Sequence, residues 1–372
     1  MTIKVGIVGF GGAGQAQANY MRLCKNLSFA GFWDPYEVKY YDLGFRTRRL
    51  VRNYKRYQSY EEMLADPGID AISICSPDYI HYEQAIKALE SYKHLIVEKP
   101  LVSKYEDGLK IKELAQKNKL IVAVQHQMRF VSLYQKIKAL MAAGKLGTIS
   151  AIEADYVQFM KKRFVMYHDW RLHRETASSA IIGAGVHFVD LICWLNEGAR
   201  VKEVYALGSH CRWPEFPSEE SVSILMKFDN GVTGKIYIDF ASLGPQRHPI
   251  TIYGSQGMIM NNLHYHSADP DQYPISSPYT IIDESKVQGF QKIWMRTQKL
   301  YSLLTGKYSL YNYPFYFYNH VESCIKSLNN FADAVMNDRP PLVGIDQGLR
   351  SIKICNSIES SLTRGGVVTV ND

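Results

Sequence analysis

The sequence predicts a doubly wound α/β domain, followed by an α+β domain built on a mostly antiparallel sheet. Three observations indicate this class. Short runs rich in β-branched residues alternate with helical segments up to residue 125, which is typical of a parallel sheet. Strand-like segments dominate after that point. At 372 residues the chain also exceeds a typical single core. We expect domains at 1–125 and 126–372, with a helix at about 345–364 packing back on the first.

The first strand is expected at residues 3–8, an apolar run that leads directly into a glycine-rich turn. The turn reads Gly9-Phe10-Gly11-Gly12-Ala13-Gly14, and a helix is expected to follow over 15–24. In such a loop the glycines permit a tight turn, the approach of a pyrophosphate and close helix–strand packing. The helix N-terminus adds unpaired N–H groups and a positive dipole end. The loop therefore predicts dinucleotide binding by a Rossmann domain.

Asp34 ends the second apolar segment, which covers residues 27–33. A carboxylate in this place can accept hydrogen bonds from both adenosine ribose hydroxyls. It would repel the 2′-phosphate of NADP, so the sequence favours NAD. Lys39 and the basic run 46–56 keep NADP possible.

The remaining elements follow from periodicity and turn residues. A polar segment after Asp34 is expected to be helical, and Ser59 with Glu62 forms a capping-box pattern. An Asp229-Asn230-Gly231 turn predicts a hairpin between two later strands. Residues 262–320 look loop-rich and aromatic. Expected strands are 69–75, 94–97, 120–124, 149–159, 201–207, 221–228 and 235–240, and expected helices are 59–64, 78–91, 104–118, 133–143, 185–195, 320–336 and 348–362.

The composition is that of a soluble globular protein, with 46% hydrophobic and 21% charged residues. A net charge of +7 is mild for this length and indicates neither nucleic acid nor membrane binding. The six cysteines lie far apart without metal-ligand spacing, so no metal site is expected and a reducing compartment fits. The longest apolar stretch, 180–195, is too short to cross a bilayer. We find no signal peptide pattern and expect a cytoplasmic protein.

Two motifs carry candidate chemistry. Glu98-Lys99-Pro100 follows an expected parallel strand, at the edge of the sheet where ligands bind in open α/β folds. Lys99 could donate hydrogen bonds to a substrate oxygen and to the cofactor ribose, and the proline is a candidate for a cis peptide bond. His187 lies at the start of an apolar helix, where it is either a functional residue or a satisfied core histidine.

Taken in order, these motifs resemble the glucose–fructose oxidoreductase / inositol dehydrogenase / rhizopine catabolism (Gfo/Idh/MocA) family. The resemblance covers essentially the whole chain except about 262–318. It is carried by Gly9 to Gly14, Asp34-Pro35, Ser76-Pro77 with His81, Glu98-Lys99-Pro100, Arg129-Phe130, Gly144-x-x-Gly147, Trp170-Arg171, His187-x-x-Asp190 and Ser361-x-x-x-Gly365.

The resemblance implies an NAD(P)-dependent oxidoreductase that moves a hydride between nicotinamide and a carbinol or carbonyl carbon of a sugar, sugar derivative or cyclitol. It implies that Lys99 polarises the reacting oxygen and that His187 exchanges the proton. Ser76, Pro77 and His81 would line the cofactor cleft, with Glu98 beside it. Relatives often pair through the open face of the second sheet, so a homodimer or homotetramer is expected.

One position departs from the family pattern: Gly183 stands where many members carry an Asp, four residues before the histidine. Asp169, Glu175 and Asp190 are possible substitutes, and Asp190 could orient His187 or be a structural partner. For the substrate we expect contacts from Lys99 and His187 and from a polar and aromatic set suited to a polyhydroxylated ring. That set is Arg129, Tyr156, Trp170 and Arg171.

Cations near this set leave further alternatives. Lys161, Arg163, His168 and His173 either indicate an acidic group on the substrate or belong to a solvated loop. Two other functions also remain open. One is a redox-neutral glycosidase or eliminase that uses NAD transiently, and the other is a non-catalytic dinucleotide sensor on the same fold.

Overall fold

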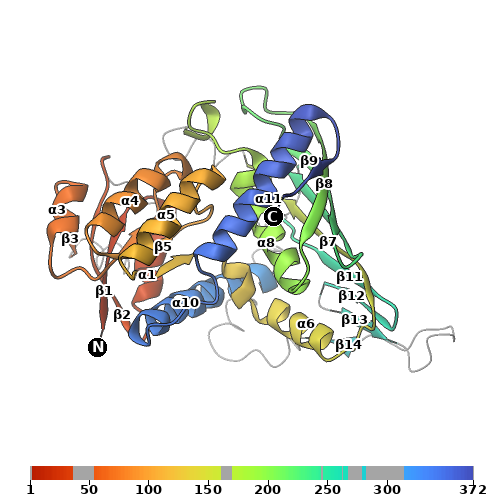
Figure 1. Ribbon diagram of the computed structural model, residues 1–372, viewed down its shortest axis with the longest axis horizontal. Helices are drawn as coiled ribbons and strands as arrows, with labels where there is room; N and C mark the ends of the chain where they lie inside the picture. The colour runs from red at the N-terminus through yellow and green to blue at the C-terminus, as the bar shows by residue number, and fades with distance from the viewer. Residues whose placement is uncertain are drawn as a thin grey trace, which may run out of the picture. The chain divides into compact units, whose positions relative to one another are not determined.

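The computed structural model describes residues 2–36, 54–160, 170–243, 246–261, 263–266, 279–281 and 314–371 (Figure 1). Most of the segment expected to be helical after Asp34 lies outside the described residues, as does most of 262–320. The described end of that segment, 54–58, was wrongly expected to be helical, because Lys55–Arg56 form a short strand that pairs with the strand before Asp34. The described residues form two compact units. The first consists of 2–127, 170–178 and 323–353, and the second of 128–160, 179–322 and 354–371.

The first unit is built on a six-stranded sheet in the order β3-β2-β1-β4-β5-β6, and each neighbouring pair is parallel. The chain moves outward in opposite directions from β1 and β4, so the order reverses between these two strands. This confirms the doubly wound class. The strands are β1 (Ile3–Val8), β2 (Leu27–Trp33), β3 (Lys55–Arg56), β4 (Ala71–Ile74), β5 (His94–Val97) and β6 (Val122–Val124).

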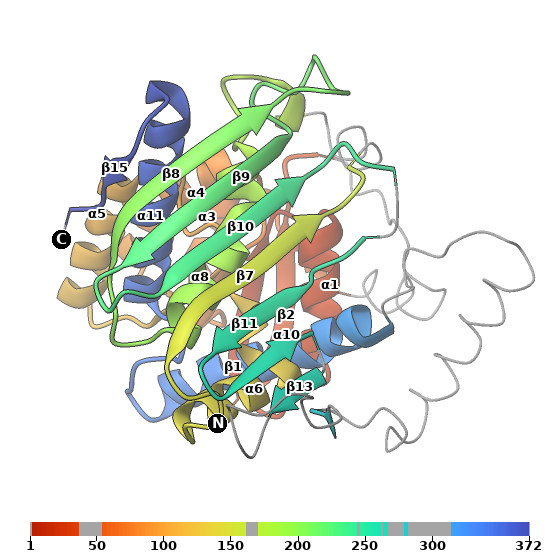
Figure 2. The same cartoon turned by 90° about the vertical axis from the view of Figure 1, so that its right-hand side faces the viewer.

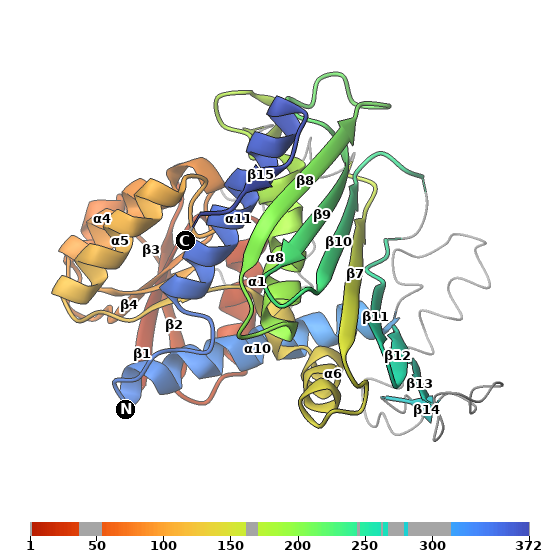
Figure 3. The ribbon, with the colours of Figure 1, turned by 45° about the vertical axis from the view of Figure 1, so that its right-hand side comes forward.

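Helices cover both faces of this sheet. Figure 3 shows α4 and α5 on one face and α1 on the other. Ser59 caps α3 by accepting a hydrogen bond from the Glu62 N–H at 2.9 Å, as the sequence predicted. The Glu62 carboxylate accepts from the Gln58 N–H at 2.7 Å, one residue before the cap. The helices are α1 (Gly12–Met21), α3 (Tyr60–Ala65), η1 (Asp78–Ile80), α4 (His81–Glu90) and α5 (Tyr105–Lys117).

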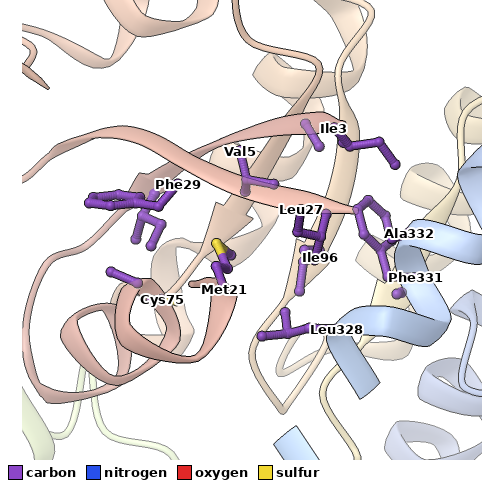
Figure 4. Packing of buried hydrophobic residues seen from close by; sticks show 14 of the residues in the cluster. Ile3, Val5, Met21, Leu27, Phe29, Cys75, Ile96, Leu328, Phe331 and Ala332 are labelled. Atoms are coloured by element: carbon purple, nitrogen blue, oxygen red, sulfur yellow. The ribbon is translucent and has the colours of Figure 1, made fainter. Parts of the chain in front are cut away.

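A late helix completes the core of this first unit. α10 (Pro314–Met336) contributes Leu328, Phe331 and Ala332 to a buried cluster with residues of β1, β2 and α1 (Figure 4). The first half of α11 (Ile345–Arg364) also belongs to this unit, where a Cβ at Gly348 would lie 2.9 Å from the Val124 side chain. Distant parts of the sequence therefore finish a core that the N-terminal pattern begins.

The second unit is built on a nine-stranded sheet in the order β14-β13-β12-β11-β7-β10-β9-β8-β15. Its described pairs are antiparallel except β7 with β10. The four expected strands and the hairpin at Gly231 are present. The strands are β7 (Ile149–Val157), β8 (Val201–Ser209), β9 (Ser221–Phe228), β10 (Thr233–Asp239), β11 (Ile250–Gly254), β12 (Gly257–Met260), β13 (Leu263–His266), β14 (Tyr279–Thr280) and β15 (Val368–Thr369).

The expectation of a loop-rich segment at 262–320 was wrong where the structure describes it: β13 and β14 extend the sheet, and α10 begins at Pro314 rather than at residue 320. β13 is four residues long and pairs along its whole length with β12. A strand of this length forms because its backbone pairs with a neighbouring strand, and its sequence is too short to show a pattern of alternation. β11 and β12 were also not predicted, although β11 pairs directly with the expected strand β7.

Among the described residues, helices cover one face of the second sheet and leave the other, here called the open face, without a helix. In β9 buried and exposed side chains alternate, and α8 (Val186–Leu195) contacts β7 and β10 on the buried side. Figure 2 presents the open face, over which no described helix lies. The unit also contains α6 (Ser132–Ala142) and a π-helical turn, η4 (Ile181–Gly185), directly before α8. None of the helices in the described parts of the chain combines the length and apolar character that a bilayer crossing requires.

Candidate nucleotide site and second-unit cluster

The glycine loop after β1 is packed too closely for side chains. Gly9 has φ +82°, and a Cβ there would lie 2.5 Å from the Ser76 backbone nitrogen. A Cβ at Gly14 would lie 2.2 Å from the Gly9 carbonyl oxygen. α1 starts at Gly12 with no side-chain cap and no acidic residue in its first turn. The helix end therefore offers N–H groups and its positive dipole to an anionic group, which fits the diphosphate of a dinucleotide.

Asp34 is held at the end of β2 by two backbone amides. Its Oδ2 accepts from the Phe10 N–H at 2.6 Å and its Oδ1 from the Tyr36 N–H at 2.9 Å. Each oxygen keeps a second acceptor site, so the fixed carboxylate can still receive ribose hydroxyls. The Phe10 ring stacks on Phe32 with centroids 3.9 Å apart and is buried. Phe10 thus supplies backbone to the site while its side chain supports the core.

His81 joins the turns that follow β4 and β5. Its Nδ1 lies 2.8 Å from the Pro100 carbonyl oxygen and its Nε2 lies 3.0 Å from the Ser76 carbonyl oxygen. The ring can donate to both oxygens when both nitrogens carry protons. The Lys99–Pro100 peptide bond is cis, as the sequence suggested. His81 is fully buried, so it serves the site by holding its walls together.

Glu98 ends a short chain of side-chain hydrogen bonds that runs across the sheet. The Ser73 hydroxyl donates to the Gln17 Oε1 at 2.6 Å, and the Gln17 amide donates to the Glu98 Oε1 at 2.6 Å. Burial raises the pKa of the Glu98 carboxyl above its ordinary value, while Gln17, Lys99 and His81 oppose the rise. The balance favours the protonated acid relative to a free glutamate.

This balance predicts a pH dependence of stability. Because the pKa of Glu98 is raised in the folded state, its contribution to stability is complete below the ordinary value of 4.5 and is lost as the pH rises through the raised pKa. Glu98→Gln keeps an acceptor for Gln17 and removes the titration. We expect melting temperatures of the variant to fall less between pH 4.5 and pH 8 than those of the wild type. An equal fall in melting temperature for the variant and the wild type over that range would contradict the assignment.

A polar and aromatic cluster surrounds His187 in the second unit. The His187 imidazole and the Tyr156 ring are parallel within 1°, with centroids 6.4 Å apart. The Tyr156 hydroxyl donates to the Gln158 Oε1 at 2.7 Å, and the His248 ring meets Tyr156 edge-on at 4.7 Å. All four side chains are buried. The structure therefore brings together Tyr156 and His187, two of the predicted residues, and adds Gln158 and His248.

The other predicted substrate residues lie elsewhere. Trp170 and Arg171 belong to the first unit, where the Trp170 ring lies 6.3 Å from that of Tyr79. The Arg171 guanidinium lies 4.0 Å from the centroid of the Trp170 ring. Tyr79 lies in η1, directly after the predicted site residues Ser76 and Pro77. His173 and Glu175 are exposed, and Lys161, Arg163, His168 and Asp169 lie outside the described residues.

Arg129 has a protein partner for its charge. Its Nε and Nη2 donate to the two carboxylate oxygens of Asp190 at 2.7 and 2.5 Å, and both residues are buried. We therefore assign Arg129 to this ion pair rather than to substrate binding. Gly183, at the position of the family Asp, lies within the π-helical turn η4, and its N–H donates to the Ser179 carbonyl at 2.7 Å.

Several of these residues carry no signal that sequence reasoning could use. Gln158 and His248 are single polar residues next to strand ends, and nothing in their spacing relates them to His187. Gln17 had a weak signal, since it is a polar residue on the helix that the glycine loop opens. Among the described residues, no group of three or more His, Cys, Asp or Glu side chains is arranged to hold a metal ion.

Comparison with known proteins agrees with this geometry. Residues 3–126 match the model described as an oxidoreductase family with an NAD-binding Rossmann fold, and residues 134–260 match the GFO/IDH/MocA C-terminal domain. The scyllo-inositol 2-dehydrogenase (NADP(+)) of Bacillus subtilis is 26% identical over 192 residues, or 51% of this chain and 50% of that protein. The glucose-6-phosphate 3-dehydrogenase of the same bacterium is 23% identical over 205 residues, or 54% and 55%. The chain spans about half the length of the curated relatives it matches.

The fold is also that of solved structures. The crystal structure of scyllo-inositol dehydrogenase from Lactobacillus casei with bound cofactor NAD(H) and scyllo-inositol has a TM-score of 0.74 at 18% identity. The match covers 100% of this chain and 99% of that one. The glycine loop, the fixed Asp34, the two sheets and both family models lead to one conclusion. This chain is an oxidoreductase of the GFO/IDH/MocA family and carries an NAD-binding Rossmann domain.

Proposed function

We propose that this protein is an NAD-dependent dehydrogenase or reductase of a sugar, a sugar derivative or a cyclitol. The observation that carries the proposal is the nucleotide site, in which an immobilised carboxylate stands beside a glycine loop. Lys99 follows β5, which is separated from the loop strand β1 by β4 in the same sheet. The inositol and sugar phosphate dehydrogenases among the relatives support the substrate class.

Each proposed catalytic residue has a role that its chemistry allows. When bound, the nicotinamide ring supplies the acceptor or donor for a hydride. Lys99 is partly exposed at the carboxyl edge of the first sheet, and its ammonium would donate a hydrogen bond to the reacting oxygen. His187 would take the hydroxyl proton during oxidation and return it during reduction, because an imidazole titrates near neutral pH. Tyr156 would contact the polyol beside it.

Absorbance at 340 nm with a panel of sugars, sugar phosphates, uronates and inositols tests the proposal. Formation of NADH with one of these compounds is the expected result. Product release without net NADH would instead favour the redox-neutral eliminase. NAD binding without turnover of any compound would favour a dinucleotide sensor.

We also propose that Asp34 selects NAD over NADP. Asp34→Ala removes a charged acceptor for the ribose hydroxyls, and such a bond contributes about 1.5–3 kcal/mol. We expect NAD affinity to fall about tenfold to a hundredfold, by that bond energy, with a smaller loss for NADP. Titration calorimetry with both cofactors measures the ratio. Asp34→Asn keeps the shape and one acceptor oxygen, so its ratio of NAD to NADP affinity should lie between those of the wild type and Asp34→Ala. An unchanged ratio in both variants would show that Asp34 does not select the cofactor.

We further propose that two copies of the chain associate through the open face of the second sheet. Leu207, Leu225, Tyr253 and Met260 are exposed there, with Leu225 at 54%. Nearby charges are paired within the chain, as in Lys235–Glu153 and Lys227–Glu203. A face that is apolar between neutralised charges suits a twofold contact with its own copy.

Light scattering tests this association. Leu225→Asp places an unpaired charge in the contact, so we expect the variant to be monomeric where the wild type is a dimer or tetramer. Leu23→Asp is the matched control, because Leu23 is 63% exposed but lies in the first unit. A wild-type monomer, or equal association in both variants, would refute the proposed contact.

A further inference from the structure

The helix that carries His187 is apolar on all sides rather than on one face. All ten residues of α8 are buried, and apart from His187 and Asp190 they are apolar. A helix that is hydrophobic on every side gains little from one rotation about its axis over another. Because each residue turns the helix by about 100°, a small rotation would redirect the His187 side chain. The burial of apolar area by itself therefore does not select the direction in which His187 points.

Contacts at the ends of this segment fix its position along the axis rather than its rotation. Before η4, the Ser179 hydroxyl donates to the Glu359 Oε1 at 2.5 Å and accepts from the Ile182 N–H at 3.2 Å. At the other end, the Lys138 ammonium donates to the Trp194 carbonyl at 2.5 Å. Both contacts lie outside the central turns of α8 that carry His187 and Asp190.

The Arg129–Asp190 ion pair holds the side of the helix instead. Asp190 lies one turn after His187, and its carboxylate meets the planar guanidinium through two hydrogen bonds. A bidentate pair of this kind fixes orientation as well as distance. Arg129 is anchored in η2 (Gln127–Phe130), where Met128 and Phe130 are buried on either side. The side chains of the pair are 2% and 0% exposed, so water does not compete for either partner.

The energetics of such a pair favour a role in orientation over one in stability. Removing two charges from water costs about as much free energy as their attraction returns, so apolar replacements of buried pairs are often neutral or stabilising. What a buried ion pair contributes is specificity, because arrangements in which either charge loses its partner are unfavourable. Any rotation of α8 that separates Asp190 from Arg129 would leave two buried charges unpaired.

We propose that the Arg129–Asp190 pair is a rotational lock on α8 that directs His187 toward the substrate, so that both are positioning residues for proton transfer. The proposal rests on the proposed role of His187. It also gives Asp190 the role that the sequence left open. The carboxylate positions the histidine through the helix, one turn away, with Arg129 as its partner.

The test replaces the pair by apolar side chains of similar size in the full-length protein. For Arg129→Met with Asp190→Leu, we expect a melting temperature equal to or above that of the wild type and an unchanged NAD dissociation constant. We expect kcat to fall at least tenfold with the substrate that the absorbance assay at 340 nm identifies. With selectively labelled histidine, the NMR contacts between the His187 and Tyr156 rings should weaken. Ser361→Ala is the control, because it removes a buried hydroxyl that bonds to Gly366 and Ala206 rather than to α8 or to the ion pair, and it should cost stability without changing kcat.

A stable double variant with wild-type kcat and intact ring contacts would overturn the lock. If that variant does not fold, Arg129→Lys is combined with His187→Gln. If Arg129 acts only through His187, the kcat of the combined variant should equal that of His187→Gln. A kcat lowered by the product of the two separate losses would refute the proposal. His187→Gln with wild-type activity would refute the proposed role of His187 itself, which separates the two failures.

Discussion

Lys99→Met is expected to lower kcat by about 10²–10³-fold while NAD still binds, because removal of one preorganised donor to a developing charge has an effect of this size. Methionine keeps most of the length of the side chain and cannot donate a hydrogen bond. Lys99 follows β5, and its neighbours Glu98 and Pro100 are held by Gln17 and His81. The backbone that presents the amine should therefore stay in place in the variant.

Steady-state rates and NAD titrations on the same preparations check this expectation. Lys104→Met is the matched control, since it removes an exposed lysine five residues further on. The control should keep wild-type kcat. Lys99→Met with more than a tenth of the wild-type rate would remove the lysine from catalysis, and a loss of NAD binding would instead assign it to the cofactor.

His187→Gln is expected to lower kcat by about 10²–10⁴-fold, the usual contribution of a positioned general acid or base. Glutamine approximates the volume of the ring beside Tyr156 and can form hydrogen bonds, but it does not titrate. The pH profile of the residual rate should therefore lose the limb that an imidazole produces near neutral pH. A purely structural histidine would lose rate without changing the shape of that profile.

Rates from pH 5 to pH 10 with the same substrate and melting temperatures for each variant check this second expectation. His173→Gln serves as the control because His173 is exposed and belongs to the first unit. Unchanged activity in His187→Gln would contradict the proton-transfer role. An unchanged pH profile with reduced activity would leave His187 as a core residue, the alternative that its sequence context left open.

The sequence was most informative where the backbone conformation requires a particular residue type. Gly9 needs a positive φ and close contact with Ser76, and such a requirement restricts a position to glycine. Asp34 directly follows the second strand of the sheet, so the number of residues between it and the glycine loop can be counted in the sequence. The other parallel strands of the first sheet were likewise predictable, because their buried residues form apolar runs, whereas the exposed, charged strand β3 was not predicted.

Predictions about charged side chains were less accurate. Arg129 looked like a substrate contact because an arginine near a pocket motif can bind anions, and the structure instead places it against Asp190, 61 residues away. Whether a buried charge meets a ligand or a protein partner depends on which side chains surround it. Neither local periodicity nor the spacing of a motif contains that information.

By itself, the sequence determined the doubly wound sheet, the dinucleotide loop and the membership of the family, because each follows from short motifs whose order can be read along the chain. The tertiary structure alone decided that α10 completes the first core, that His81 joins two turns and that Arg129 pairs with Asp190. These are contacts between distant segments. α10 joins the core because its apolar side chains are buried away from water, and the contacts of His81 and Arg129 form because buried polar groups must find partners.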